Sequence, residues 1–167
     1  GLVYTFHLRD DLQWSNGEAI TTHDVVYSWR RAVNPATASD YAGMLYYVKN
    51  AEAINSSELT DLSRLGVRAV DDQTVRVELA APTPFFIELC AFWTLAVVPE
   101  TAIARHGDQW CLSRRLPVSG SHTLEHWRVR DRIRLRRHAR YWAAANTRNE
   151  DIDLLPQDPV DAAQAPS

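Results

Sequence analysis

The sequence predicts a mixed α/β fold in which helices and strands follow one another without a regular repeat. Segments whose apolar residues alternate with period two, as they do in strands, occur near both ends of the chain. Between them, apolar residues recur with the period of a helix. Because no strand–helix unit recurs at a fixed interval, a barrel is not expected.

The composition is that of a globular protein: of 167 residues, 46% are hydrophobic and 23% are charged. Lys and Arg number 18 and Asp and Glu number 21, so the net charge is −3. This balance argues against a generally basic nucleic-acid binder and against an acidic disordered tail. The longest apolar region, Phe85–Val98, is interrupted by Glu88 and Thr94 and is shorter than the ~20 residues of a membrane span.

The first expected element is a strand over Val3–Leu8, followed by a helix that begins after Thr21. Thr21 is a suitable N-cap residue, and Asp24 stands at the position from which a side chain reaches back to the cap. The helix ends at Asn34-Pro35, because proline cannot continue the backbone hydrogen bonds. Its apolar face consists of Val25, Val26, Trp29 and Val33.

A second helix is expected from about Asp40 to Ile54, where apolar residues recur at helical spacing. Two strands, Val67–Val70 and Thr74–Leu79, then flank Asp71-Asp72-Gln73, which is typical of a hairpin turn. In the second strand, apolar and polar residues alternate, which predicts one buried and one exposed face.

The second half of the chain is expected to hold two helices and two strands. A short apolar helix spans about Phe85–Phe92, and another begins at Pro99, whose fixed φ suits the first helical position. Gly107 ends that helix, since glycine adopts the left-handed conformation common after a last turn. The strands are expected at Thr123–Trp127 and Arg132–Arg136.

His122-Thr123-Leu124-Glu125-His126 has the H-x-x-E-H spacing of inverted zinc peptidases. That chemistry requires a helix, which brings two histidines four residues apart onto one face. The flanking Ser119-Gly120-Ser121 and Trp127-Arg128 favour extended chain, in which residues four apart are separated by ~13 Å. We therefore expect two solvated strand histidines and no metal site. The alternative is a zinc peptidase, and a metal analysis would distinguish the two.

Nine arginines lie between Arg114 and Arg140 in a chain that is acidic overall. One interpretation is contact with phosphate or RNA, and the other is an exposed strand face on which every second residue is arginine. The nearby aromatic residues, Trp127, Tyr141 and Trp142, flank this run and do not interleave with it. We expect no nucleic-acid partner, and keep a basic-strand nucleic-acid or anion interaction module as an alternative. The arginines of common parity are Arg128, Arg130, Arg132, Arg134 and Arg136.

Nothing in the sequence argues for an enzyme. There is no glycine-rich phosphate loop, no G-x-S-x-G motif and no Cys–His pairing, so no cofactor is expected. The only cysteines are Cys90 and Cys111, too few for a disulfide scaffold and without metal-ligand spacing. Cys90 is expected as a buried free thiol. The alternative is a Cys90–Cys111 disulfide, which an oxidising compartment would allow.

Read together, these segments resemble the extracytoplasmic solute-binding proteins of peptide ABC importers, solute-binding family 5, and among them the oligopeptide-binding proteins. The resemblance runs in order from the first residues to about Trp142. One departure is Ser119-Gly120-Ser121-His122, where relatives carry an aromatic residue that anchors packing. The matching segments are Tyr4–Arg9, Trp14–Glu18, Thr21–Arg31, Asn34–Ala42, Leu65–Asp72, Ala81–Phe86, Val98-Pro99, Gly107–Trp110 and Arg140–Trp142.

The resemblance implies a periplasmic-binding-protein type II-like two-lobed fold, present only as a fragment because family members are about three times as long. Residues 1–96 are expected to form most of the smaller lobe preceding the first hinge crossing, at about Ala96–Pro99. Residues 97–167 are expected to form the hinge and the start of the opposite lobe, without the C-terminal domain and with no signal segment in the chain.

The resemblance also implies a function: capture of oligopeptides in the periplasm, or by a lipid-anchored protein at the cell surface, and delivery to an inner-membrane ABC permease and ATPase. The intact receptor is expected to be a monomer. In this family the tyrosine of the T-A-S-x-Y-A motif contacts the peptide, which makes Tyr41, with Ser39, the expected ligand-binding residues. The remaining alternative is a truncated, non-functional gene product.

Overall fold

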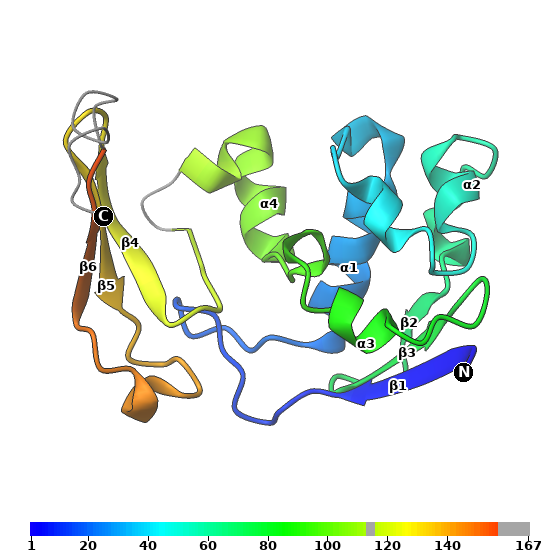
Figure 1. The fold of residues 1–167 in the computed structure, drawn as a ribbon, viewed down its shortest axis with the longest axis horizontal. Helices are drawn as coiled ribbons and strands as arrows, with labels where there is room; N and C mark the ends of the chain where they lie inside the picture. The colour runs from blue at the N-terminus through cyan, green and yellow to red at the C-terminus, as the bar shows by residue number, and fades with distance from the viewer. Residues whose placement is uncertain (113–115, 157–167) are drawn as a thin grey trace, which may run out of the picture.

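The computed structural model describes residues 1–112 and 116–156 (Figure 1). Two three-stranded antiparallel sheets lie toward opposite ends of the long axis, and the helices lie between and above them (Figure 1). The first sheet has the order β1-β3-β2, with β1 at Val3–His7, β2 at Val67–Ala69 and β3 at Thr74–Glu78. The second has the order β4-β5-β6, with β4 at His122–Arg128, β5 at Arg132–Arg137 and β6 at Asp151–Leu154.

Four α-helices and six short 3-10 helices complete the described part of the chain. The α-helices are α1 (Thr22–Val33), α2 (Ala51–Asn55), α3 (Phe86–Leu89) and α4 (Glu100–His106). The 3-10 helices are η1 (Pro35–Thr37), η2 (Ala42–Leu45), η3 (Leu62–Arg64), η4 (Trp93–Leu95), η5 (Gly107–Leu112) and η6 (Ala144–Asn146).

Helix α1 and the β2–β3 hairpin form where the sequence predicts them. The backbone N–H of Thr21 donates to the Asp24 carboxylate at 2.9 Å, which caps the start of α1. In the hairpin turn, the Asp71 carboxylate accepts from the backbone N–H groups of Gln73 and Thr74 at 2.9 and 2.6 Å. These bonds stabilise the ionised carboxylate and lower the pKa of Asp71.

The single helix predicted over Asp40–Ile54 is wrong. The chain instead forms η2, pairs Val48 with Leu79 next to β3, and resumes a helix only at α2. Lys49 donates its N–H to the Glu78 carbonyl, and Asn50 then takes a left-handed φ of 65°. The backbone groups of this segment are therefore used by the neighbouring sheet. Of the apolar residues that gave the helical spacing, Leu45, Val48 and Ala51 are in the core, as is Ile54, whereas Met44 is only half-buried.

The helix predicted over Phe85–Phe92 is shorter than expected, since α3 has only four residues. Phe86 is fully buried, whereas Phe85 and Ile87 are about half exposed. Pro99 directly precedes α4, and Gly107, at a φ of 55°, ends it.

One hydrophobic core holds together the first sheet and the helices that cover it. Trp29 of α1 donates its indole N–H to the Leu95 carbonyl at 3.0 Å, and its ring meets Phe86 edge-on. All sixteen residues of this buried cluster lie between Val25 and Leu95. The second sheet has no fully buried apolar side chain in its described strands: Leu124, Ile133, Leu135 and Ile152 are half-buried, and Trp127 and Leu154 are exposed.

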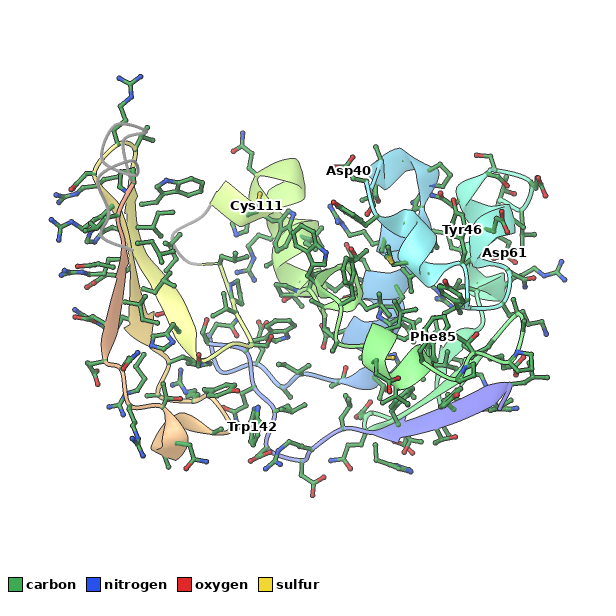
Figure 2. All side chains as sticks on the ribbon, viewed as in Figure 1. Asp40, Tyr46, Asp61, Phe85, Cys111 and Trp142 are labelled. Atoms are coloured by element: carbon green, nitrogen blue, oxygen red, sulfur yellow. The ribbon has the colours of Figure 1, made fainter. Side chains whose placement is uncertain are left out.

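Residues 9–18, hereafter the linking segment, join the two halves of the molecule. Ser15 donates its N–H to the Val118 carbonyl at 2.9 Å and accepts the Val118 N–H on its hydroxyl at 3.1 Å. Arg140 donates to the Ser15 carbonyl at 3.2 Å. Figure 2 shows the Trp142 side chain beside this segment. These polar contacts attach the second half to the linking segment, in which Trp14, next to Ser15, is also buried.

Candidate ligand-binding site

Ser39 and Tyr41, the two residues expected to bind ligand, line the same pocket of about 210 Å³. Their neighbour Asp40 lies near the end of α1 that is farther from the first sheet (Figure 2). Three segments build the walls: the second half of α1, the loop after η1, and the stretch from η4 toward α4. The lining residues are Ser28, Arg31, Ala32, Thr37, Ser39, Tyr41, Trp93, Thr94, Ala96 and Val98.

Aromatic rings dominate the mouth of the pocket. The Tyr41 ring lies 5.4 Å from that of Trp93 and 5.9 Å from that of Phe92, centre to centre. Tyr41 is 46% exposed and Trp93 is 67% exposed, which is unusual for side chains of this size. Within the described residues, the Tyr41 hydroxyl makes no hydrogen bond, so it is available to a ligand.

The floor of the pocket is fixed by Ser28 on α1. Its hydroxyl donates to the Asp24 carbonyl at 2.6 Å and accepts the Val98 N–H at 2.8 Å. This pair of bonds holds the stretch before α4 against α1. The rings of Tyr41 and Trp93 therefore lie next to a part of the pocket that is fixed to a helix. Rigid elements position binding groups better than loops do.

Arg31 and Trp93 line the pocket, although the sequence did not identify them as site residues. Arg31 is the only charged side chain among the lining residues, and its guanidinium lies 5.8 Å from the centre of the Trp110 ring. It also lines a second, larger pocket of about 490 Å³. The sequence shows that Arg31 lies in the helix after Thr21, but it does not show which segment packs beside it. Trp93 belongs to the apolar region Phe85–Val98, in which the sequence does not distinguish buried from exposed rings.

The two histidines of the zinc-like motif lie on β4, as the strand prediction requires, but both are half-buried, so the expectation that they are solvated is wrong. His122 contacts the Asn149 carbonyl through Nε2 at 3.0 Å, and His126 pairs in register with Arg134. No group of three or more His, Cys, Asp or Glu side chains in the described ranges could hold a metal ion. The H-x-x-E-H spacing is thus realised in the extended geometry, which does not bring its two histidines onto one ion.

The proposed continuous arginine face is wrong, because a turn at residues 129–131 interrupts it and Arg130 adopts a left-handed φ of 63°. The β5 arginines are, moreover, paired with acidic residues that the sequence did not assign to a partner strand. Arg134 contacts Asp153 at 2.5 and 2.7 Å, and Arg136 contacts Glu125 at 2.9 Å and Asp151 at 3.3 Å. These guanidinium groups form ion pairs with carboxylates and are therefore less available to the phosphates of a nucleic acid.

Cys90 is half-buried, and burial raises the pKa of its thiol to about 11. It takes part in no disulfide within the described residues, and Cys111 is exposed at the end of η5. The protein also has no helix, in the described part of the chain, with the length and apolar character needed to cross a membrane.

Known proteins with similar sequences include periplasmic binding proteins. The chain is 40% identical over 160 residues to the probable deoxycholate-binding periplasmic protein YgiS of Escherichia coli, a match that covers 95% of this chain and 30% of that protein. It is 38% identical over 156 residues to the periplasmic oligopeptide-binding protein OppA of Salmonella typhimurium, covering 92% of this chain and 28% of that one. The chain therefore spans about 30% of the length of the curated relatives that it matches.

Solved structures show the same relationship. OppA of Burkholderia pseudomallei superposes with a TM-score of 0.91 at 34% identity, covering 97% of this chain and 32% of that one. Haemophilus influenzae OppA in complex with RPPGFSPFR gives a TM-score of 0.87 at 34% identity, covering 92% of this chain and 30% of that one. The mixed helix and strand fold expected from the resemblance is confirmed for this portion of the relatives.

A family model described as bacterial extracellular solute-binding proteins, family 5 Middle, matches residues 1–165. That match covers nearly the whole chain, and the segments that carry the sequence resemblance lie within it. The chain belongs to family 5 of the bacterial extracellular solute-binding proteins.

Proposed function

We propose that this chain is part of an extracytoplasmic receptor that captures oligopeptides and delivers them to an ABC importer. The observation that carries the proposal is the pocket at Tyr41, where exposed aromatic rings and hydroxyl groups share one mouth in a member of family 5. The receptor works by binding and by closure around its ligand, without breaking bonds and without a cofactor.

An extended peptide suits the chemistry of this pocket. The Tyr41 and Ser39 hydroxyls can each donate or accept a hydrogen bond to the main chain of a peptide, which gives affinity that does not depend on side-chain identity. The rings of Tyr41 and Trp93 offer apolar surface to whatever side chain lies over them. The pocket is shallow, so this face alone encloses little of a peptide.

We also propose that residues 1–96 belong to one lobe and residues 97–167 to the hinge and the start of the opposite lobe. The division is supported by the core, whose buried cluster ends at Leu95, and by the separate sheet that begins at β4. In this division α4, whose Ala102 is buried and which packs near α1, belongs to the hinge region, and the opposite lobe begins after it.

The partners in this proposal are an oligopeptide and the permease and ATPase of an inner-membrane ABC importer. The receptor acts as a monomer in the periplasm, or attached to the cell surface through a lipid. These assignments rest on the periplasmic, oligopeptide-binding relatives and on the ligand pocket, and the nucleic-acid alternative is disfavoured by the paired arginines of β5.

Amide chemical-shift titration of the 167-residue chain with trialanine tests the proposal. We expect shifts confined to residues 37–41 and to the Trp93 indole, with weak binding, on the order of 1 mM, because the pocket is open on one side. Tyr41→Phe should reduce the shifts. Tyr47→Phe is the matched control, since Tyr47 is also exposed but packs on Phe85 outside this pocket. Shifts that are absent, or spread over the surface without a focus at the pocket, would reject the proposal.

A steroid carboxylate is a second candidate ligand class, favoured by the 40% identical relative described as a probable deoxycholate-binding protein. The exposed Trp93 ring offers a flat apolar surface, and Arg31 offers a cation at the same pocket. The same titration with deoxycholate, below its micelle concentration, decides between the classes. A focused response to deoxycholate and none to trialanine would select the steroid.

A further inference from the structure

Two arginines stand directly opposite each other on the exposed face of the first sheet. Arg68 of the edge strand β2 pairs in register with Arg76 of β3. Side chains in such positions start about 4.5–5.5 Å apart, and like charges there are destabilising. Thr5 lies on the other side of Arg76 in β1, so that strand supplies no compensating charge at this level of the sheet.

The two arginines line a pocket of about 260 Å³ together with further cations. Only one carboxylate, that of Glu78, belongs to this lining, and it already contacts Lys49 at 3.3 Å and Arg76 at 3.5 Å. The pocket thus holds four cations and one anion, in a chain whose net charge is −3. Its lining residues are Lys49, Asn50, Ser63, Arg64, Leu65, Gly66, Val67, Arg68, Arg76 and Glu78.

Arg64 and Arg68 have no carboxylate within ion-pair distance among the described residues. The pKa of Asp61 is lowered chiefly by hydrogen bonds from Ser63, and the charge of Arg64 is a smaller cause. The four β5 arginines differ, because each of them contacts a carboxylate of β4, of the turn after it, of β6 or of Glu150, which precedes β6. Among the arginines of the described strands, Arg68 of β2 is thus the one without an ion pair, and Arg64 of η3 adds a second such cation to the same pocket.

The floor of this pocket is built around Gly66. A Cβ atom there would lie 2.5 Å from the Glu78 carbonyl oxygen and 2.8 Å from the Lys49 Cβ, so no side chain fits. The backbone N–H of Gly66 donates to the Lys49 carbonyl, and the Gly66 carbonyl accepts from Glu78. Because these backbone groups are used, the donors left for a ligand are those of the cationic side chains.

We propose that the β2-edge pocket, defined by Lys49, Arg64, Arg68 and Arg76, binds a phosphate-type oxyanion. A tetrahedral anion with more than one negative charge can accept bonds from several guanidinium groups at once, in the bidentate geometry that arginine favours. Such an anion offsets the repulsion between Arg68 and Arg76. The site is separate from the Tyr41 pocket, with which it shares no lining residue.

Thermal unfolding and amide chemical shifts of the 167-residue chain test this proposal with inorganic phosphate as the probe. Phosphate is compared with chloride at equal ionic strength, so that general screening is the same in both. We expect phosphate to raise the unfolding midpoint and to shift the amides of residues 66–68 and 76. Arg68→Thr should bind phosphate about tenfold more weakly, which corresponds to the loss of one charge-assisted contact.

The variant also tests the repulsion itself. Without phosphate, Arg68→Thr should unfold at a higher temperature than the unmodified chain, since removing one arginine relieves the like-charge pair. Arg148→Thr is the control, because it removes the same charge from an exposed position outside the pocket. That variant should keep the full phosphate response.

Vesicles distinguish the source of the phosphate group. Cosedimentation with phosphatidylglycerol vesicles, but not phosphatidylcholine vesicles, that is lost in Arg68→Thr identifies a lipid headgroup. A phosphate response without cosedimentation identifies a free oxyanion. The proposal is overturned if phosphate acts no differently from chloride, if Arg68→Thr responds like the unmodified chain, or if that variant is less stable in the absence of phosphate.

Discussion

The guanidinium of Arg9 lies 4.4 Å from the centre of the Trp142 ring, so a cation near the start of the chain stacks on an aromatic side chain in the connection between β5 and β6. The same guanidinium contacts Asp11 at 3.1 Å, which orients it within the linking segment. Together with the bonds of Ser15 to Val118 and Arg140, this contact holds the β4–β6 sheet in place.

We expect Arg9→Gln to loosen the second sheet without unfolding the first. A cation–π contact at an exposed site contributes ~0.5–1 kcal/mol. A double-mutant cycle with Trp142→Leu, read by the urea midpoint, measures this contact directly. Additive effects of the two substitutions would show that the stacked geometry contributes nothing.

Tyr41→Phe should weaken trialanine binding by ~0.5–1.5 kcal/mol, the value of one neutral hydrogen bond. The hydroxyl is free to form that bond, because no group in the described residues occupies it. Tyr41→Ala should weaken binding further, since it also removes the ring that meets Trp93. Equal affinity of the unmodified chain, Tyr41→Phe and Tyr41→Ala, measured by chemical-shift titration, would show that Tyr41 does not contact the ligand.

Backbone amides of β4 and β5 should exchange with solvent faster than those of β2 and β3. The first sheet packs Val67, Val75 and Val77 into the core, each at most 2% exposed, whereas the second sheet buries no apolar side chain to that degree in the described strands. Local openings are easiest where few apolar contacts hold an element. Hydrogen exchange of a monomeric sample provides the measurement, and equal protection of the two sheets would contradict the expectation.

Acid should release β6 before the first sheet unfolds. The hydrogen bonds from Arg134 hold the pKa of Asp153 below its ordinary value of 3.8. A lowered carboxyl pKa means that the pair stabilises the fold above the ordinary value and that this contribution is lost as the pH falls below it. Asp153→Asn should therefore increase exchange in β6 at pH 7 and remove its acid dependence. Asp10→Asn, at an exposed residue of the linking segment, serves as the control.

The thiol of Cys90 should be slow to react with iodoacetamide at pH 8. Burial raises its pKa from 9.0 to about 11, so the thiolate fraction at pH 8 falls roughly 100-fold, and the thiolate is the reactive form. A raised pKa also means that the stability linked to this thiol is present below pH 9 and declines as the pH rises toward 11. Mass spectrometry of Cys90 in folded and urea-unfolded protein tests this, and equal rates in both states would show that the thiol is accessible.

Local signals were sufficient for some elements. The reach of Asp24 back to Thr21 fixes where α1 begins, and the Asp71 side chain closes the hairpin turn within three residues. Both involve groups that are close in sequence, so their pattern is visible in the residues alone. Tyr41 and Ser39 were identified through the family motif rather than through periodicity; both line one pocket, and their contact with a ligand stays a prediction.

Long-range pairing explains what the sequence did not show. The helix expected through Val48 is interrupted because that residue pairs with Leu79, which is far away in the chain. The arginines of β5 look unpaired until β6 brings Asp151 and Asp153 beside them. Trp93 is a residue type that is often buried. In the structure its ring contacts Phe92 and Tyr41 and lies at the surface.

The two hydrogen bonds between Ser15 and Val118 also set an order for biosynthesis. The ribosome adds Val118 only 103 residues after Ser15, which takes roughly 5–20 s at ~5–20 residues per second. During that interval the β2–β3 hairpin and α1 can already pack, because all of their partners have been made. The linking segment is held at its final position only when the emerging second half reaches it, so the nascent chain assembles its core first and attaches its second sheet last.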